Sequence, residues 1–132
     1  MLVHRKIPKV RRNEGTAAVE AALIAPVLFF AILGIIELGT AFWQWNTMLL
    51  AVEQAGRYVM VNNSSCDVSC AETQMQAVLP AASVCTTPSA GQISVCASTS
   101  ASSMTLTSTY SFNLLSLFGP FTITSQGTVP LI

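Results

Sequence analysis

The sequence predicts an α+β protein: a long N-terminal transmembrane α-helix continues into a small disulfide-bonded domain with a short helix and a three-stranded antiparallel sheet. Three observations lead to this fold class. Basic residues precede an apolar segment, the chain beyond it keeps a helical pattern, and the C-terminal part alternates apolar and hydroxyl residues. We expect residues 1–15 to form a basic N-terminal segment, residues 16–62 the transmembrane and stem helix, and residues 63–132 the small C-terminal domain.

Charge is distributed very unevenly along the chain. Only 9% of the residues are charged, and 52% are hydrophobic. Five of the six basic residues lie before the apolar segment: Arg5, Lys6, Lys9, Arg11 and Arg12. Such a cluster resembles a nucleic-acid arm, but its place directly before an apolar segment favours a signal that keeps the N-terminus in the cytoplasm. We therefore expect no nucleic-acid partner.

The apolar segment Ala21–Ile36 contains no charged residue and lies between Glu20 and Glu37. Together with residues 38–43 it reaches the length of about 20 residues that a membrane span needs. The helical pattern continues beyond it, so we predict one helix, kinked or loosened near Pro26 and Gly34. Trp43 and Trp45 follow the span. Two interpretations stay open for them, the outer membrane interface and packing against the C-terminal domain.

Beyond the span, apolar residues recur at alternating steps of four and three and form a stripe on one helix face. The stripe consists of Leu38, Phe42, Trp45, Leu49, Val52, Gly56 and Val59. It predicts packing within the chain or a coiled-coil seam, or packing against sister subunits. Glu53 and Arg57 are spaced for an ion pair across one helical turn.

The run Glu14-Gly15-Thr16-Ala17-Ala18-Val19-Glu20 places a glycine before the apolar segment and a glutamate five residues after that glycine. It resembles the processing site of type IV pilin-like proteins. The following stem, with Pro26 and Gly34-Ile35-Ile36-Glu37-Leu38-Gly39, is similar to the TadE-like minor pseudopilins of the tight adherence (Tad) pilus. The resemblance covers nearly the whole chain. Ala21 departs from it, because the family often has an aromatic residue after the glutamate.

The resemblance implies a minor pseudopilin that a prepilin peptidase cuts after Gly15, so that residues 1–15 are a leader peptide. Glu20 would pair with the new amine of Thr16 on a neighbouring subunit; alternatively, Glu20 is solvated among lipid headgroups. The expected partners are other pilin and pseudopilin subunits. The expected location is the bacterial inner membrane, with the C-terminal domain in the periplasm or carried into an extracellular pilus. An uncleaved single-pass scaffold and a signal-anchored, adhesin-like module remain alternatives.

The part of the chain after Asn62 predicts a short helix and three strands. Ser69-Cys70-Ala71-Glu72 matches a capping box, with a helix to Leu79 that Pro80 ends. Period-two alternation marks strands around residues 93–97, 104–112 and 121–129. Residues 113–120 form an apolar loop that we expect to be buried.

All four cysteines, Cys66, Cys70, Cys85 and Cys96, follow the apolar segment. If the N-terminus stays in the cytoplasm, they face an oxidising compartment, which favours disulfides over zinc. Their spacings also lack the close pairs of structural zinc sites. Three pairings are possible, and we favour the local pairs Cys66 with Cys70 and Cys85 with Cys96.

The sequence does not favour an enzyme. After Glu72 the chain has no Asp, Glu, Lys, Arg or His, so its many serines lack an activating base. We expect no catalytic residue, no cofactor, no metal and no small-molecule substrate.

Overall fold

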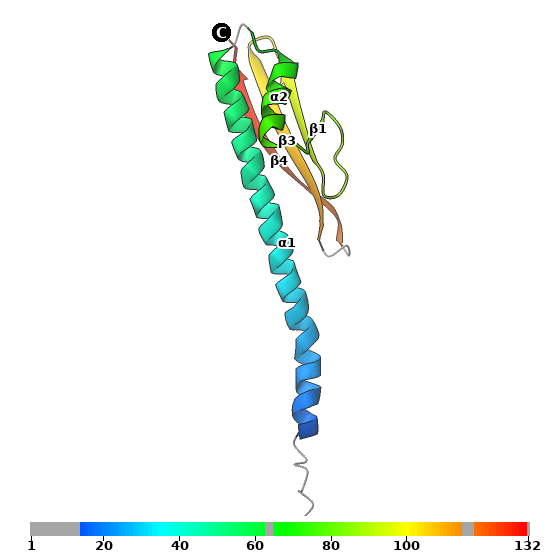
Figure 1. Cartoon of the computed structure of the whole chain (residues 1–132). Coiled ribbons are helices and arrows are strands. Elements are labelled where there is room, and N and C mark those ends of the chain that lie inside the picture. The colour runs from blue at the N-terminus through cyan, green and yellow to red at the C-terminus, as the bar shows by residue number, and fades with distance from the viewer. Residues whose placement is uncertain (1–13, 63–64, 115–117, 132) are drawn as a thin grey trace, which may run out of the picture. The chain divides into compact units, whose positions relative to one another are not determined.

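The structure is a computed structural model that describes residues 14–62, 65–114 and 118–131. Its elements are, in order, α1 (Glu14–Val61), α2 (Val68–Val78), β1 (Ser83–Val84), β2 (Ile93–Thr99), β3 (Ser103–Leu114) and β4 (Phe118–Pro130) (Figure 1). Contacts divide the chain into two units, one ending at Leu33 and the other beginning at Gly34. The basic cluster before Glu14 lies outside the described residues.

Helix α1 runs without interruption through Pro26 and Gly34, which confirms the prediction of one long helix. Alanine and leucine are its commonest residues, and both are among the strong helix formers. Pro26 has no backbone N–H, so one hydrogen bond of the helix is missing there, but the helix continues beyond it. At the other end, the N–H of Asn62 still donates to the carbonyl of Tyr58 at 3.0 Å.

The sheet has four strands in the order β1-β2-β3-β4. Strands β2, β3 and β4 pair antiparallel, and they are the three predicted strands. The prediction of a purely antiparallel sheet was wrong, because β1 pairs parallel with β2. With only two residues, β1 is too short to show alternation in the sequence. A disulfide from the next residue, Cys85, ties it to Cys96 of β2.

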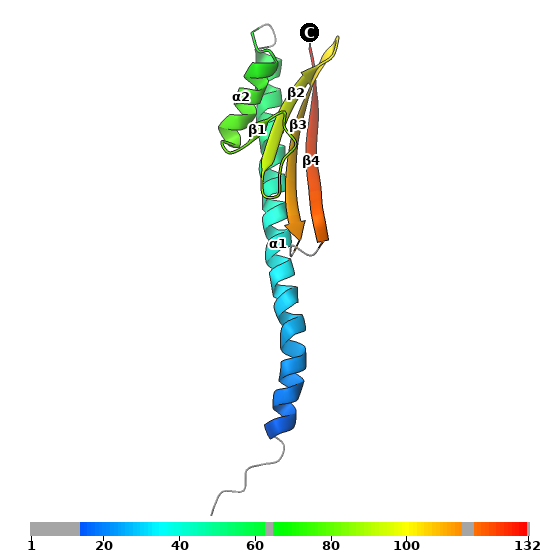
Figure 2. The same ribbon diagram turned by 90° about the vertical axis from the view of Figure 1, so that its right-hand side faces the viewer.

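Both helices lie on one face of the sheet (Figure 2), and this face is apolar. The other face carries mainly hydroxyl side chains. Val95, Leu106 and Val129 are buried on the inner face, as the alternation predicts. Ser108 interrupts this face, and its Oγ atom is buried without a hydrogen-bond partner among the described residues.

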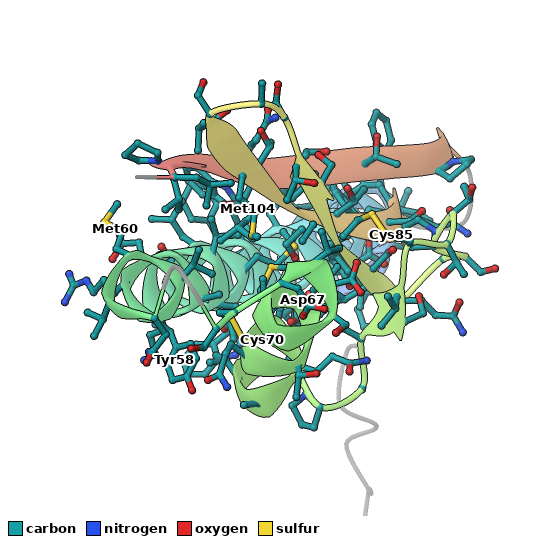
Figure 3. All side chains as sticks on the ribbon, turned by 90° about the horizontal axis from the view of Figure 1, so that it is seen from above. Tyr58, Met60, Asp67, Cys70, Cys85 and Met104 are labelled. Atoms are coloured by element: carbon teal, nitrogen blue, oxygen red, sulfur yellow. A yellow bond between two sulfur atoms is a disulfide. The ribbon has the colours of Figure 1, made fainter. Side chains whose placement is uncertain are left out.

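Helix α2 packs over β2, whereas α1 packs over β3 and β4. Figure 3 shows Met104 of β3 between the sheet and the helices, with Tyr58 on a side of α1 that does not face the sheet. The fully buried side chains therefore come from every layer. The apolar ones with no exposed surface are Met48, Ala51, Ala55, Val59, Ala71, Met75, Val95 and Leu106, and Ser108 is equally buried.

The buried face of α1 is only partly the predicted stripe. Val52, Gly56 and Val59 are buried, but the larger residues at the start of the stripe are exposed: Leu38, Phe42, Trp45 and Leu49. Ala41 and Met48 are buried at this level instead. Small side chains let the helix approach the sheet closely, so the bulky apolar face is left outward. The predicted Glu53–Arg57 ion pair is absent from the described part of the chain as well.

Two glycines mark the closest approach of α1 to the sheet. A Cβ atom on Gly127 of β4 would lie 2.7 Å from the Cγ1 atom of Val52. A Cβ atom on Gly56 of α1 would lie 3.3 Å from the Cγ2 atom of Val129. Gly127 is therefore required by packing and not by an unusual backbone conformation.

Gly127→Ala is expected to lower the free energy of unfolding by about 1–3 kcal/mol, because the new methyl group must displace the stiff, buried Val52 side chain. Thermal unfolding of the oxidised protein in detergent measures this. Gly119→Ala, also in β4, is the matched control, because nothing lies within 4 Å of a Cβ atom there. Equal melting temperatures for the two variants would contradict the packing described.

Candidate functional site: the N-terminal helix and the cysteine-linked segment

The residues of the predicted processing site lie at the beginning of α1. Gly15 and Thr16 are in its first turn, and Glu20 follows one turn after Thr16 on the same face. All three are exposed. Glu20 has no ion-pair or hydrogen-bond partner among the described residues. The structure thus brings Thr16 and Glu20 onto one accessible helix face.

The helix that follows is apolar all round and uncovered. Its most apolar window has a mean hydropathy of 2.5, and none of that window is buried. The exposed fraction of the side chain is 71% for Leu23 and 65% for Phe29. By length and composition this helix can cross a membrane. Together with the pilin-like stem, it suggests that the chain is anchored in a membrane.

Glu37 marks the level at which α1 meets the folded domain. It is half-buried and lines a groove of about 300 Å³ together with Ala41, Tyr110 and Phe112. Trp43, six residues further along the helix, is 74% exposed, so it does not pack against the domain. That finding contradicts the packing interpretation for Trp43 and leaves the membrane-interface interpretation as a proposal.

The cysteines form two local disulfides, Cys66–Cys70 and Cys85–Cys96. The first joins the residue before the N-cap of α2 to the first turn of that helix, and the second joins the residue after β1 to β2. Because all four thiols are oxidised, no thiolate is left to bind zinc. The one close group of potential ligands in the described part of the chain, Glu72 with Cys85 and Cys96, contains a disulfide.

The cap of α2 differs from the predicted one. Asp67, not Ser69, is the N-cap, and its Oδ1 atom accepts from the N–H of Cys70 at 3.0 Å and from the hydroxyl of Ser69 at 2.8 Å. The helix ends at Val78, with Leu79 as C-cap before Pro80. The N-cap thus lies two residues earlier than the sequence pattern implied, directly after Cys66, which the disulfide to Cys70 ties to the first turn of the helix.

Glu72, the predicted partner in the capping box, points to the sheet instead. Its Oε1 atom accepts from the backbone N–H of Ala97 in β2 at 3.2 Å and lies 3.2 Å from the sulfur of Cys85. The carboxylate therefore accepts the hydrogen bond of a backbone N–H group at the β2 edge of the sheet.

The described chain thus combines an exposed, apolar N-terminal helix with a small β-sheet on which the second half of that helix packs. Residues 15–57 match the model of the TadE-like protein family. This confirms the predicted resemblance for the stem, which is similar to the TadE-like proteins, a family of structural components of the Tad pilus. The match does not extend to the C-terminal domain, to which the predicted resemblance also reached. Neither the curated proteins nor the solved structures give a match to the chain.

Sequence reasoning missed one feature of the sheet, the unpaired outer edge of β4. The signal was present, because Pro120 and Pro130 enclose a stretch without a charged residue. Proline is confined to edge strands and strand ends, so these two residues mark an edge.

The pKa of Asp67 is lowered, chiefly because the N–H of Cys70 donates to its carboxylate and also because the Ser69 hydroxyl does. A carboxyl group with a lowered folded pKa stabilises the fold fully above its unfolded pKa, near 3.8, and this stabilisation is lost as the pH falls through the folded value. Asp67→Ala should therefore lower the melting temperature at neutral pH. The difference from wild type should shrink from about pH 5 to about pH 2.

Asp67→Asn is the matched control, since asparagine caps helices without titrating. Its melting temperature should fall less steeply in acid than that of the wild type. A difference between wild type and Asp67→Ala that stays constant over this range would contradict the assignment of the cap.

Proposed function

We propose that this chain is a minor pseudopilin that a prepilin peptidase cuts after Gly15 and that acts in assembly of a Tad-type pilus or secretion filament. The observation that carries the proposal is the family match, which begins at Gly15 itself and follows the uncovered helix. Its partners are the peptidase and other pilin and pseudopilin subunits.

Gly15 fits a role in recognition. Its surroundings are open, with nothing within 4 Å of a Cβ atom, and its φ angle is not in the left-handed region. Neither packing nor backbone conformation therefore requires glycine at this position. A requirement imposed by a peptidase is consistent with both facts.

The length of the apolar segment favours a special role for Glu20. The 16 residues from Ala21 to Ile36 span about 24 Å as a helix, less than the hydrocarbon thickness of about 30 Å. At the outer end, Glu37 belongs to the folded domain, which does not enter lipid. The shortfall then lies at the inner end and draws Glu20 into the edge of the hydrocarbon, where a carboxylate needs a partner.

After cleavage, the amine of Thr16 is the nearest new positive charge. Pairing of Glu20 with this amine on a neighbouring stem satisfies both charges and fixes the register between subunits, because a shifted neighbour leaves each charge unpaired. Thr16 and Glu20 share one face within a subunit, so the neighbour's amine competes with the subunit's own.

The uncovered apolar surface determines how such a stem leaves the membrane. Exposing it to water costs about 25 cal/mol per Å², so the stem leaves lipid only by exchanging lipid contacts for contacts with other stems. The exposed Phe29 and Phe30 offer area for that exchange. The two disulfides agree with a periplasmic C-terminal domain, because disulfides persist in that compartment.

One observation favours a second candidate, an uncleaved single-pass scaffold of the same machine. The Gly15–Thr16 bond lies within α1, which begins at Glu14, so the first turn must unwind before a peptidase can cut. A chain that starts at Met1 in cells with and without the peptidase would establish the scaffold instead.

Glu20→Ala and Glu20→Gln should leave cleavage after Gly15 intact and lower incorporation into filaments by about tenfold or more, because the neighbour's buried amine loses its partner. Intact mass and N-terminal sequence measure cleavage. The ratio of the protein in sheared filaments to that in membranes measures assembly.

Glu37→Gln is the control, a neutral substitution of another glutamate on the same helix, and should assemble normally. Normal filament incorporation of both Glu20 variants would rule out the pairing mechanism.

A further inference from the structure

The hydrogen bonds of β3 fix which backbone groups of β4 are unpaired. The carbonyl of Ser103 accepts from the N–H of Ser100, and Ser111 exchanges bonds with Gly91 and Gln92. Odd-numbered residues of β3 thus face β2, and even-numbered ones face β4. Their partners in β4 are the odd-numbered residues Phe121, Ile123, Ser125, Gly127 and Val129.

The intervening residues of β4 direct their N–H and C=O groups to the outer edge: Thr122, Thr124, Gln126 and Thr128. In the described part of the chain, the backbone groups of these four residues form no hydrogen bond with another element. Pro120 and Pro130 are also even-numbered, so their backbone nitrogens point to the outer edge as well. Because proline has no N–H, each proline ends the row of free backbone donors at one end of this edge.

This edge lacks the devices that normally prevent strand addition. Natural edge strands carry charges, bulges or covering loops, but Thr122–Thr128 has no charged residue, and the one register shift lies at Asn113 and Leu114. The exposed side chains on its outer face are three threonines and a glutamine. The ladder is therefore open to a strand with uncharged polar residues on that face.

A groove of about 360 Å³ lies on the inner side of the same edge, between α1 and β4. Its apolar lining comes from Leu49, Val52 and Met60 of α1, and from Leu106 and Val129 of the sheet. Glu53 and Arg57 stand beside it without forming an ion pair. A strand added to β4 would direct alternate side chains into this groove, where apolar ones fit.

A second copy of this chain does not supply the strand. The opposite edge of the sheet is covered by β1, and Glu72 occupies the N–H of Ala97. Two β4 edges also cannot pair within one membrane. Val52 contacts Gly127 and Gly56 contacts Val129, so β4 runs parallel to α1, and antiparallel pairing would invert one of the two helices.

Parallel pairing of two β4 strands by a two-fold axis along them also fails. It sets the edge-facing residues of both strands opposite one another, whereas a parallel ladder needs them offset by one residue.

We propose that the β4 edge and this groove bind an extended segment of a different subunit, which adds a fifth strand to the sheet. The segment carries apolar side chains toward α1 and uncharged polar ones beside the threonines, as in strand-addition complexes. The exclusion of a second copy depends on membrane anchoring and so rests on the proposed function.

The test places a photo-crosslinking phenylalanine analogue at position 126 of the full-length chain in cells that carry the complete pilus machine. The expected adduct contains an alternating apolar and polar segment of another subunit, identified by peptide mass. Thr124→Pro should reduce this adduct by about tenfold or more, because it removes one edge-facing N–H without breaking a bond to β3. Thr124→Val keeps the N–H and should leave the adduct unchanged.

The same analogue at position 98, on the exposed part of β2, is the positional control. Melting temperatures verify that each variant folds, and Thr124→Lys provides a second block of the edge that retains the backbone N–H. The proposal would be overturned by any of four results: an adduct with a second copy, an equal adduct from position 98, no protein adduct, or an adduct that neither Thr124→Pro nor Thr124→Lys reduces.

N-terminal sequencing of the same samples distinguishes failure of the strand addition from failure of the proposed function. A start at Met1 contradicts the proposed processing, whereas a start at Thr16 without the adduct contradicts only the strand addition.

Discussion

Val52 of α1 lies so close to Gly127 of β4 that no methyl group fits between them, and one turn later Gly56 lies against Val129. This contact joins α1 to the sheet, and the core depends on it, because five of the fully buried residues, Met48, Ala51, Ala55, Val59 and Leu106, lie on the two sides of the same layer. Without it the inner face of β3 and β4 would be open to water. The approach also explains why small residues, Ala51, Ala55 and Gly56, lie on the buried face of α1 where the helix is nearest to β4.

A single helix therefore serves two environments. Before Glu37 the helix is apolar on every side and uncovered, as a span in lipid requires. From Ala41 onward, one face of the helix packs in the core of the folded domain. Because the helix is continuous, the apolar segment that follows Glu20 leads directly into the residues that pack on the sheet. The bulky exposed residues just beyond Glu37, Leu38 and Phe42 among them, remain available to other helices. Assembly by exchange of stem contacts needs both properties.

Most of the architecture was predictable because periodicity reports burial directly. The long helix followed from an uninterrupted apolar pattern, and strands β2, β3 and β4 followed from alternation. The local disulfides were favoured among three possible pairings. The errors have physical causes. The two residues of β1 carry no periodic signal, and the cap at Asp67 depends on a disulfide that fixes the preceding turn. The buried face of α1 depends on how closely the helix approaches the sheet, which hydrophobicity alone does not encode. The free edge of β4 required the strand order.

The claim that α1 supplies one side of the domain core is tested most directly by comparing two fragments, residues 40–132 and residues 65–132. Both are expressed in the periplasm with both disulfides formed. Thermal unfolding followed by circular dichroism, with the dispersion of backbone amide signals in NMR, measures whether each fragment folds. If α1 supplies one side of the core, the longer fragment unfolds cooperatively and gives dispersed signals, whereas the shorter one does neither. A shorter fragment that folds with the same melting temperature would contradict the claim that the membrane helix and the domain share one core.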